Sequence, residues 1–284
     1  MSAPVRTVRA GAQYPASVTS LYASGVQHRQ LVWDLSKRAV SARYRGSLLG
    51  IAWSLITPIL MLAVYTFVFS VVFQARWGSI GEAENRFDFA MLLFAGLVTH
   101  AFLAEVLNRS TRLISGNANY VKKVVFPLEI LPVVEAISAL FQLCLGVTVL
   151  LVLHAIVYQT AYPTVLFMPV VLLPFCVLAV GLAWLFASVT VFVRDLEQVM
   201  PLLTMVLLFL APIFYPITAV PEGFRGWIML NPLTFVVDQV RRVTLLGLPP
   251  DWSGLAVYSV IAVLIAWLGY RVFQSLRRGF ADVV

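Results

Sequence analysis

QVMPLLTMVLLFLAPIFYPITAVP, residues 198–221, is the stretch that decides the fold of this chain. It is uncharged and long enough to cross a membrane, yet it contains Pro201, Pro212, Pro216 and Pro221. Lipid tolerates a broken backbone only where protein or a water-filled cavity surrounds it, because an unsatisfied amide in hydrocarbon costs several kcal/mol. The stretch therefore predicts a re-entrant or pathway-lining element, and transport becomes the first hypothesis.

The composition around this stretch indicates an all-α integral membrane protein. Hydrophobic residues make up 61% of the chain and charged residues only 12%, against roughly 25% charged in soluble proteins. A helix needs about 20 apolar residues to cross the hydrocarbon layer, so the long uncharged intervals mark the spans. Six spans are expected in one transmembrane domain, 46–284, at about residues 48–73, 89–108, 134–158, 165–192, 199–220 and 253–272.

The distribution of positive charge predicts the orientation. An even number of spans puts both termini on one side, and Lys and Arg collect on the cytoplasmic side of membrane proteins. With the N-terminus inside, fifteen of the twenty Lys and Arg residues are cytoplasmic, and only Arg76, Arg86, Arg225, Arg241 and Arg242 are external. We therefore expect both termini in the cytoplasm, and the net charge of +7 needs no nucleic-acid partner.

Residues 28–45, which follow a cytoplasmic tail at 1–27, are predicted to form a basic amphipathic helix before the first span. Such a helix lies in the membrane interface, either as an anchor of topology or as a moving gate element. On the helical wheel, the apolar side is predicted to hold His28, Leu31, Leu35, Ala39 and Ala42 with Val32 at its edge. The opposite side is polar and basic. The candidate gate residues are Trp33, Lys37, Arg38, Arg43 and Arg45.

The cytoplasmic loop 109–130 is the strongest candidate for a docking surface. Gly116 and Asn117 suit a helix start and Pro127 a boundary, so a short helix is expected over 119–125, with Tyr120, Val124 and Phe126 as exposed apolar knobs; a plain solvated loop is the alternative. A second turn follows Val193. The candidate contact residues are Asn117, Asn119, Tyr120, Lys122, Lys123, Arg194 and Asp195.

The external segment, 211–250, carries Asp238 three and four residues before Arg241 and Arg242. This spacing favours local ion pairs on a helix. Guanidinium groups also suit phosphate geometry, so Arg241 and Arg242 are candidate contacts for a lipid phosphate as well.

Aromatic residues recur every fourth position along the first predicted span. Such a stripe either packs against a neighbouring helix or presents ring faces along a sugar pathway. The candidate channel-lining aromatics are Tyr65, Phe69 and Phe73, extended at the outer end by Phe214 and Tyr215.

Catalytic chemistry is not evident in the sequence. It has no phosphate-binding loop of the Gly-x-x-x-x-Gly-Lys-Ser/Thr type, no catalytic constellation and no metal-ligand spacing, and Cys144 and Cys176 fall inside spans. Glu105 and Glu135, at predicted membrane edges, are expected to be paired or hydrated. The chain is therefore expected to be no enzyme by itself, and its energy source is a partner on the cytoplasmic side.

Three segments, in order on six spans, resemble one family. RAVSARYRGSLLGIAWSLITPILMLAVYTFVFSVVF (38–73), GNANYVKKVVFPLEILP (116–132) and VRDLEQVMP (193–201), the last with PIFYPITAV (212–220) and LNPLTFVVDQVRRVTLLG (230–247), are similar to membrane subunits of type 2 ABC exporters of lipid-linked polysaccharides.

The resemblance implies a homodimer bound to two separate ATPase subunits, which bind the ATP and Mg²⁺. It implies that residues 28–45 are a gate helix, 115–123 a coupling helix and 211–250 a re-entrant external cap, in the bacterial inner membrane. The implied cargo is a polyprenyl-pyrophosphate-linked polysaccharide, with O-antigen first and capsule, teichoic acid or galactan next. Exporters of drugs or small lipids, an ATP-independent channel and a polyprenyl-phosphate-handling enzyme are the alternatives.

Overall fold

The computed structural model describes residues 27–72, 87–122 and 126–283, and every regular element within them is helical. Five helical stretches are long and apolar enough to cross a membrane, which makes the chain a multi-pass membrane protein. They are Gly50–Val68, Phe87–Ser110, Ile130–Tyr158, Pro163–Thr190 and Trp252–Val283.

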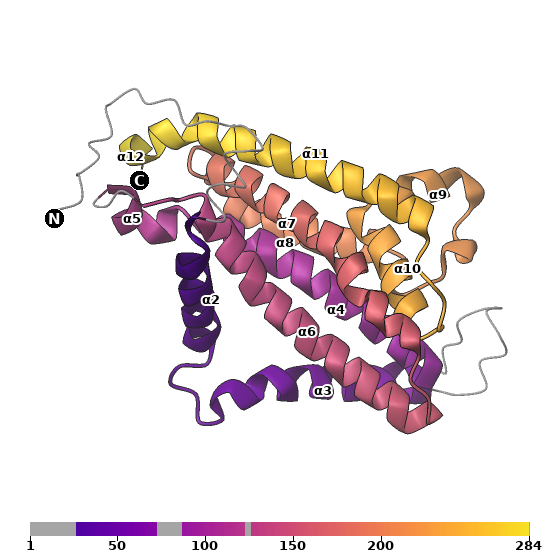
Figure 1. The fold of residues 1–284 in the computed structure, drawn as a ribbon. Helices are drawn as coiled ribbons and strands as arrows, with labels where there is room; N and C mark the ends of the chain where they lie inside the picture. Colours follow the sequence, from indigo (N-terminus) through magenta and orange to yellow (C-terminus); the bar gives the residue numbers. More distant parts are fainter. Residues whose placement is uncertain (1–26, 73–86, 123–125, 284) are drawn as a thin grey trace.

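The long helices run side by side, and α2 and the short helices lie at their ends (Figure 1). Helix α2 runs crosswise to the bundle, and α3 turns back along it (Figure 1). In chain order the α-helices are α2 Arg29–Arg43, α3 Trp53–Tyr65, α4 Phe87–Ser110, α5 Ala118–Lys122, α6 Ile130–Tyr158, α7 Met168–Thr190, α8 Leu196–Leu210, α9 Glu222–Met229, α10 Pro232–Thr244, α11 Trp252–Leu276 and α12 Phe280–Val283. Short 3₁₀ turns occupy Gly50–Ala52, Ser115–Asn117, Pro163–Phe167, Ile217–Ala219 and Arg277–Gly279, and a π-helical segment, Thr66–Val72, continues α3.

The expected span 199–220 holds a shorter helix. Helix α8 has 15 residues and ends at Leu210, because Ala211 has extended backbone angles (φ −83°, ψ 148°) and Pro212 follows. Fifteen residues rise about 22 Å, less than the ~30 Å of hydrocarbon. The proline-rich second half of the stretch thus leaves the helix, as the prolines predicted, and runs on as a turn toward α9.

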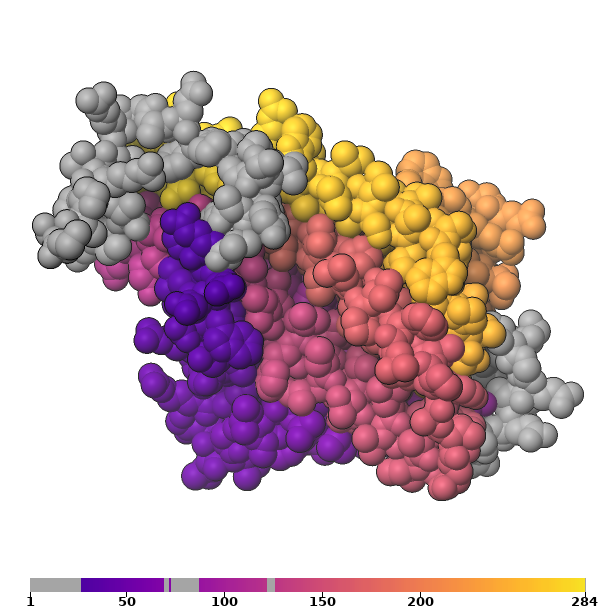
Figure 2. Space-filling model, viewed as in Figure 1, coloured from indigo at the N-terminus to yellow at the C-terminus, as the bar shows by residue number. Residues whose placement is uncertain are grey.

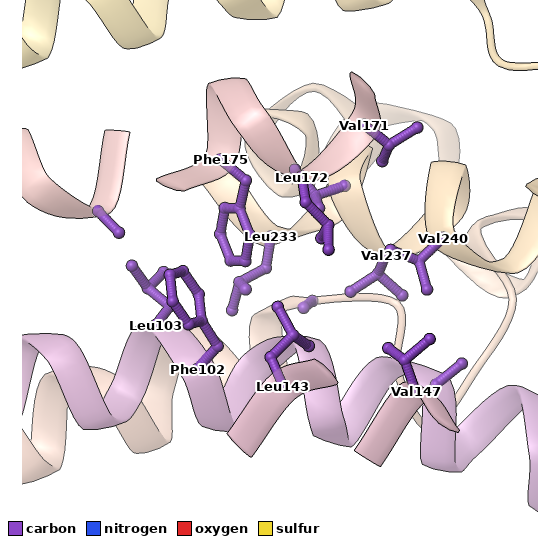
Figure 3. Close-up of a cluster of buried hydrophobic side chains, with 14 of the residues drawn as sticks. Phe102, Leu103, Leu143, Val147, Val171, Leu172, Phe175, Leu233, Val237 and Val240 are labelled. Atoms are coloured by element: carbon purple, nitrogen blue, oxygen red, sulfur yellow. The ribbon is translucent and has the colours of Figure 1, made fainter. Parts of the chain in front are cut away.

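Helix α10 returns into the bundle and contributes to its core. Asn231 caps its N-terminus by accepting a hydrogen bond from the Leu233 amide at 3.0 Å, and Pro232 occupies the first turn, where its missing amide costs nothing. In Figure 3 its side chains face those of α4, α6 and α7. The buried α10 residues include Leu233, Val236, Val237, Val240 and Val243.

The tightest helix pair is α7 with α11. A Cβ on Gly269 would lie 2.0 Å from the carbonyl oxygen of Gly181, and a Cβ on Gly181 would lie 2.5 Å from Cα of Ala266. Small residues let backbones approach where apolar helices gain little from leaving lipid. The pair therefore forms a rigid wall of the bundle.

Helix α3 is the least covered of the apolar helices. Only 11% of its most apolar window is buried, against 61% for α4. Together with α2 it forms one edge of the molecule (Figure 2). Helix α8 is also open, with Met200 and Thr204 its only buried residues. Two apolar helices of this subunit are thus left largely without protein neighbours in the described part of the chain.

Candidate functional site

Helix α2, the expected gate helix, packs along α6. Ser36 is the buried residue of the helix, Leu35 and Ala39 are half-buried, and Ala42 is exposed. The Ser36 hydroxyl donates to the Val32 carbonyl at 2.7 Å, so its polar group is satisfied within the helix. That the apolar side of this helix lies in the membrane interface stays a prediction.

The candidate gate residues divide into two groups. Trp33 is 61% exposed, and Lys37 lies 5.6 Å from the centre of its ring and 3.0 Å from Asp34. Arg38 and Arg45 are exposed as well. These side chains leave a charged and aromatic surface on the outside of α2. Arg43 alone turns toward the bundle.

Arg43 begins a chain of ion pairs that ties α2 to α4 and α6. Its guanidinium pairs with Glu105, which also accepts from Arg109 Nε at 3.1 Å. Arg109 Nη1 in turn lies 3.2 Å from Glu135. The prediction that both acids are paired or hydrated is confirmed. The orientation of α2 is thus linked to α4 and α6 through these ion pairs.

The expected coupling loop contains a 3₁₀ turn, Ser115–Asn117, and then α5, which starts at Ala118. Asn117 donates to the Leu113 carbonyl at 2.8 Å, and Asn119 is exposed. Lys122 belongs to α5, but its side chain, like all of Lys123, lies outside the described residues.

The aromatic residues of this loop are not free knobs. The Tyr120 and Phe126 rings stack with centroids 4.5 Å apart, and both pack on a buried cluster that includes Leu113, Ile114 and Phe280. Val124 lies outside the described residues. The loop is therefore held against the bundle by its aromatic side, while Asn119 stays exposed.

Helices α7 and α11 anchor the end of this loop, which the sequence did not reveal. Arg277 Nη1 lies 2.6 Å from Glu129 Oε2, and Arg277 Nη2 donates to the Phe126 carbonyl at 3.0 Å. Trp184 Nε1 donates to the Glu129 carbonyl at 2.8 Å. Glu129 and Arg277 are 148 positions apart, so no local spacing could have paired them.

The second expected contact, Arg194 and Asp195, lies in the exposed turn between α7 and α8. The same region is joined to the coupling loop, because Arg112 Nε lies 3.2 Å from Glu197 Oε2 at the start of α8. The two cytoplasmic candidates thus belong to one connected surface.

Three of the candidate channel-lining aromatics have described side chains: Tyr65, Phe214 and Tyr215. Tyr65 is half-buried and lines a cavity of about 550 Å³ between α2, α3, α4 and α6. Phe214 and Tyr215 fold back on the end of α8: the Phe214 ring lies 5.5 Å from that of Phe209, and the Tyr215 hydroxyl donates to the Phe209 carbonyl at 2.9 Å. The Phe69 side chain and Phe73 lie outside the described residues.

The two arginines of the segment expected outside differ. Arg241 is 6% exposed, and its guanidinium donates to the carbonyls of Leu92 (2.9 Å), Pro212 (2.7 Å) and Ile213 (3.1 Å). These bonds favour a structural role over a phosphate contact. Arg242 is half-buried and donates to the Pro249 carbonyl at 3.3 Å. Asp238, the expected ion-pair partner of both, accepts a hydrogen bond from Gln239 Nε2 at 3.1 Å, and the ion pair stays a prediction.

Residues 30–245, which run from the gate helix to the end of α10, match the family model for the ABC-2 type transporter. The chain belongs to the ABC-2 type transporter family. An ABC-2 chain of this kind is the membrane component of a transporter rather than an enzyme, and it works with an ATPase subunit. Within the described residues, the apolar faces of α3 and α8 are the least covered by this chain itself.

Curated ABC-2 relatives match nearly the whole chain. An O-antigen export system permease protein RfbA from Myxococcus xanthus is 27% identical, covering 91% of this chain and 96% of the relative. A protein of the same name from Klebsiella pneumoniae is 22% identical over 88% and 93%. The polysialic acid transport protein KpsM of Escherichia coli is 22% identical over 84% and 90%.

Proposed function

We propose that this ABC-2 membrane component forms the channel of an ATP-driven exporter of polyprenyl-pyrophosphate-linked polysaccharide, O-antigen first, in the bacterial inner membrane. The observation that carries the proposal is the end-to-end match to O-antigen export permeases, which covers 91% of the chain in one relative and 88% in another. A match of that extent includes the gate helix, the coupling loop and the external segment together.

The proposed topology has six spans with both termini in the cytoplasm. Helix α8 is the fifth span, shorter than the others, and the turn after it with α9 and α10 forms a re-entrant external cap. The burial of α10 among α4, α6 and α7 supports this, because a helix that dips into the membrane must be enclosed by protein. The excess of Lys and Arg on the other side supports the orientation.

Two copies of the chain enclose the proposed channel. Helices α3 and α8 are apolar and open, with exposed side chains that include Ile59, Met61, Leu202, Met205 and Phe209. A second copy packing there would bury part of this surface, and the half-buried Tyr65 would then lie close to the pathway.

In the proposed cycle, two ATPase subunits bind ATP with Mg²⁺ and dock on the surface formed by α5 and the turn at Arg194 and Asp195. Movement of α5 reaches the bundle through the stacked Tyr120 and Phe126, and reaches α8 through Arg112 and Glu197. The gate helix follows through the Arg43, Glu105 and Arg109 ion pairs.

Deletion of the gene tests the cargo. Surface polysaccharide should disappear while the lipid-linked polymer accumulates inside the cell, and the cloned gene should restore export. A surface glycan at the parental level in the deletion strain would contradict the proposal. An exporter of drugs or small lipids would instead change resistance or lipid content with the glycan intact.

The docking surface has its own test. Lys122→Glu combined with Lys123→Glu should lower export and transport-coupled ATP hydrolysis at least about tenfold, because a reversed charge at a docking surface repels the partner. Arg278→Glu, at an exposed cytoplasmic position, is the matched control and should retain activity. Equal activity in the two variants would place docking elsewhere.

A capsule exporter is the second candidate. The 22% identity to polysialic acid transport proteins over 84% of the chain supports it. The glycan missing from the deletion strain distinguishes the two: loss of the lipopolysaccharide ladder indicates O-antigen, and loss of capsule indicates the second candidate.

A further inference from the structure

A second cavity lies far from the cytoplasmic surface, between the outer ends of α4, α6 and α10 and the turn that follows α8. Its volume is about 490 Å³, which falls in the range of small-molecule sites, roughly 300–1,000 Å³. It shares no lining residue with the cavity that Tyr65 lines, and its lining residues all belong to one copy of the chain. None of the roles assigned above uses it as a binding site.

One wall of this cavity is aromatic. His154 has ring neighbours in Tyr158, 4.9 Å away, and Tyr162, 5.3 Å away. The Tyr162 ring packs against Gly247, where φ is +65° and a Cβ would lie 2.6 Å from the ring. The Tyr158 hydroxyl is buried and has no hydrogen-bond partner among the described residues. A buried hydroxyl of this kind usually has a partner, and a ligand in the cavity would supply one.

Planar polar side chains of α10 form the facing wall. Asp238 is exposed and accepts one described hydrogen bond, from Gln239 Nε2. Gln239 Oε1 accepts from the Asp251 amide at 2.8 Å, which fixes the Gln239 amide plane. Arg242 uses Nε and Nη2 on the Pro249 carbonyl and leaves Nη1 without a described hydrogen bond. Acceptors and donors are therefore both available toward the cavity.

The balance of charge argues for a neutral ligand. Three carboxylates, Asp88, Asp238 and Asp251, line the cavity with two guanidinium groups, and Arg241 already donates to three carbonyls. A phosphate would face the Asp238 carboxylate at close range, where like charges repel. A metal ion would need a cluster of at least three ligating side chains, and the described residues contain no such cluster.

We propose that this cavity binds one neutral sugar unit of a saccharide. A sugar ring offers C–H faces to Tyr158 and Tyr162 and adjacent hydroxyls to Asp238 and Arg242, which matches an apolar pocket with a few placed polar groups. The inference rests on the proposed function, in which the site would hold polymer on the external side after it leaves the channel. The site lies within one copy, so it does not depend on the channel between copies.

Saturation-transfer NMR on the purified permease–ATPase complex in nanodiscs tests the site. The probe is the neutral oligosaccharide released by mild acid from the host's own surface polysaccharide, with sodium pyrophosphate as a charged competitor. Asp238→Asn and Tyr158→Phe should each weaken the oligosaccharide's binding about threefold to tenfold, which corresponds to one lost hydrogen bond. Glu222→Gln, at an exposed external carboxylate outside the cavity, should bind as the parent does.

Thermal unfolding of each solubilised variant distinguishes the loss of a ligand contact from the loss of the fold. Thr218→Trp, which fills the cavity, is a second variant that should weaken binding of the oligosaccharide. Equal saturation transfer in the parent, Asp238→Asn and Thr218→Trp would overturn the inference, and so would displacement of the oligosaccharide by pyrophosphate. If either outcome is found and deletion of the gene still abolishes surface glycan, the sugar site is wrong but the proposed function stands. A deletion strain with normal glycan would instead contradict the proposed function itself.

Discussion

Arg241 joins α4, α10 and the turn after α8 through three hydrogen bonds. The break after α8 releases the carbonyls of Pro212 and Ile213 from helical hydrogen bonding, and Arg241 donates to both and to the Leu92 carbonyl of α4. Gly96 makes room for it, since a Cβ there would lie 3.2 Å from Arg241 Nη2. One guanidinium thus compensates the backbone groups that the prolines release.

Arg241→Lys should destabilise the protein by about 3 kcal/mol, because a lysine cannot reach all three carbonyls and each buried acceptor left unsatisfied costs about 1–3 kcal/mol. Unfolding of the solubilised protein by heat, followed by circular dichroism, measures the effect. Arg242→Lys changes a half-buried residue whose described hydrogen bonds both go to the Pro249 carbonyl; it is the matched control and should change stability little. Equal midpoints for the two variants would contradict the role given to Arg241.

At this scale the sequence identified Arg241 but not its main-chain hydrogen-bond partners. It singled out Arg241 and Arg242 and paired them with Asp238, three and four residues away. The carbonyls that accept from Arg241 belong to residues that are 149, 29 and 28 positions distant. A spacing rule covers neighbours on one helix, and it cannot represent a carbonyl released by a break elsewhere.

Among the elements, the α7–α11 pair is the most sensitive to side-chain volume. Gly269→Ala should destabilise the protein by about 1–3 kcal/mol, because its methyl group would overlap the Gly181 carbonyl and force the helices apart. Gly226→Ala, in α9, has open space around its Cβ and should be neutral or slightly stabilising. Thermal midpoints of the two variants give the comparison, and a neutral Gly269→Ala would show that the helices are not in close contact.

The end of the coupling loop is positioned by the last span. Arg277→Glu should reduce export and coupled ATP hydrolysis about tenfold, because it breaks a largely buried ion pair with Glu129 and puts two acids side by side. The swap Glu129→Arg with Arg277→Glu should restore part of the activity at normal expression. If Arg277→Glu is as active as the parent, the Glu129–Arg277 ion pair does not serve coupling.

The sequence predicted which segments form the long apolar helices, but it did not predict where each helix ends or which residues of other helices it contacts. Long uncharged intervals predicted the apolar helices because lipid demands satisfied backbone groups over a fixed thickness. The prolines predicted a break in the fifth span, but the expected span 199–220 is longer than α8, which ends at Leu210. The inward turn of Arg43 toward Glu105 was missed, because the two residues are 62 positions apart on different helices.

For the whole molecule, the proposed topology makes a direct prediction. Alkaline phosphatase fused after Pro221 should be active, because that position is external, and the same enzyme fused after Asn119 should be inactive in the cytoplasm. A cytoplasmic reporter at the same two positions should give the opposite pattern. Activity after Asn119 with none after Pro221 would reverse the orientation.

The core and the open apolar faces of the molecule differ in how far one chain completes them. The core around Phe102 and Phe175 is buried within one chain. The apolar faces of α3 and α8 are largely exposed in the described part of the chain. Their exposure argues for a second copy, whereas the sequence alone marked them only as spans.

Reconstitution in liposomes tests the central claim most directly. The purified permease and its ATPase partner would be inserted with the ATPase outside, and fluorescent lipid-linked polysaccharide would be added to the same face. We expect ATP with Mg²⁺ to move the glycan into the lumen, where a membrane-impermeant glycosidase cannot reach it, and we expect no such protection with the Lys122→Glu, Lys123→Glu variant. Glycan that stays accessible with ATP, or becomes protected equally without it, would contradict ATP-driven export by this protein.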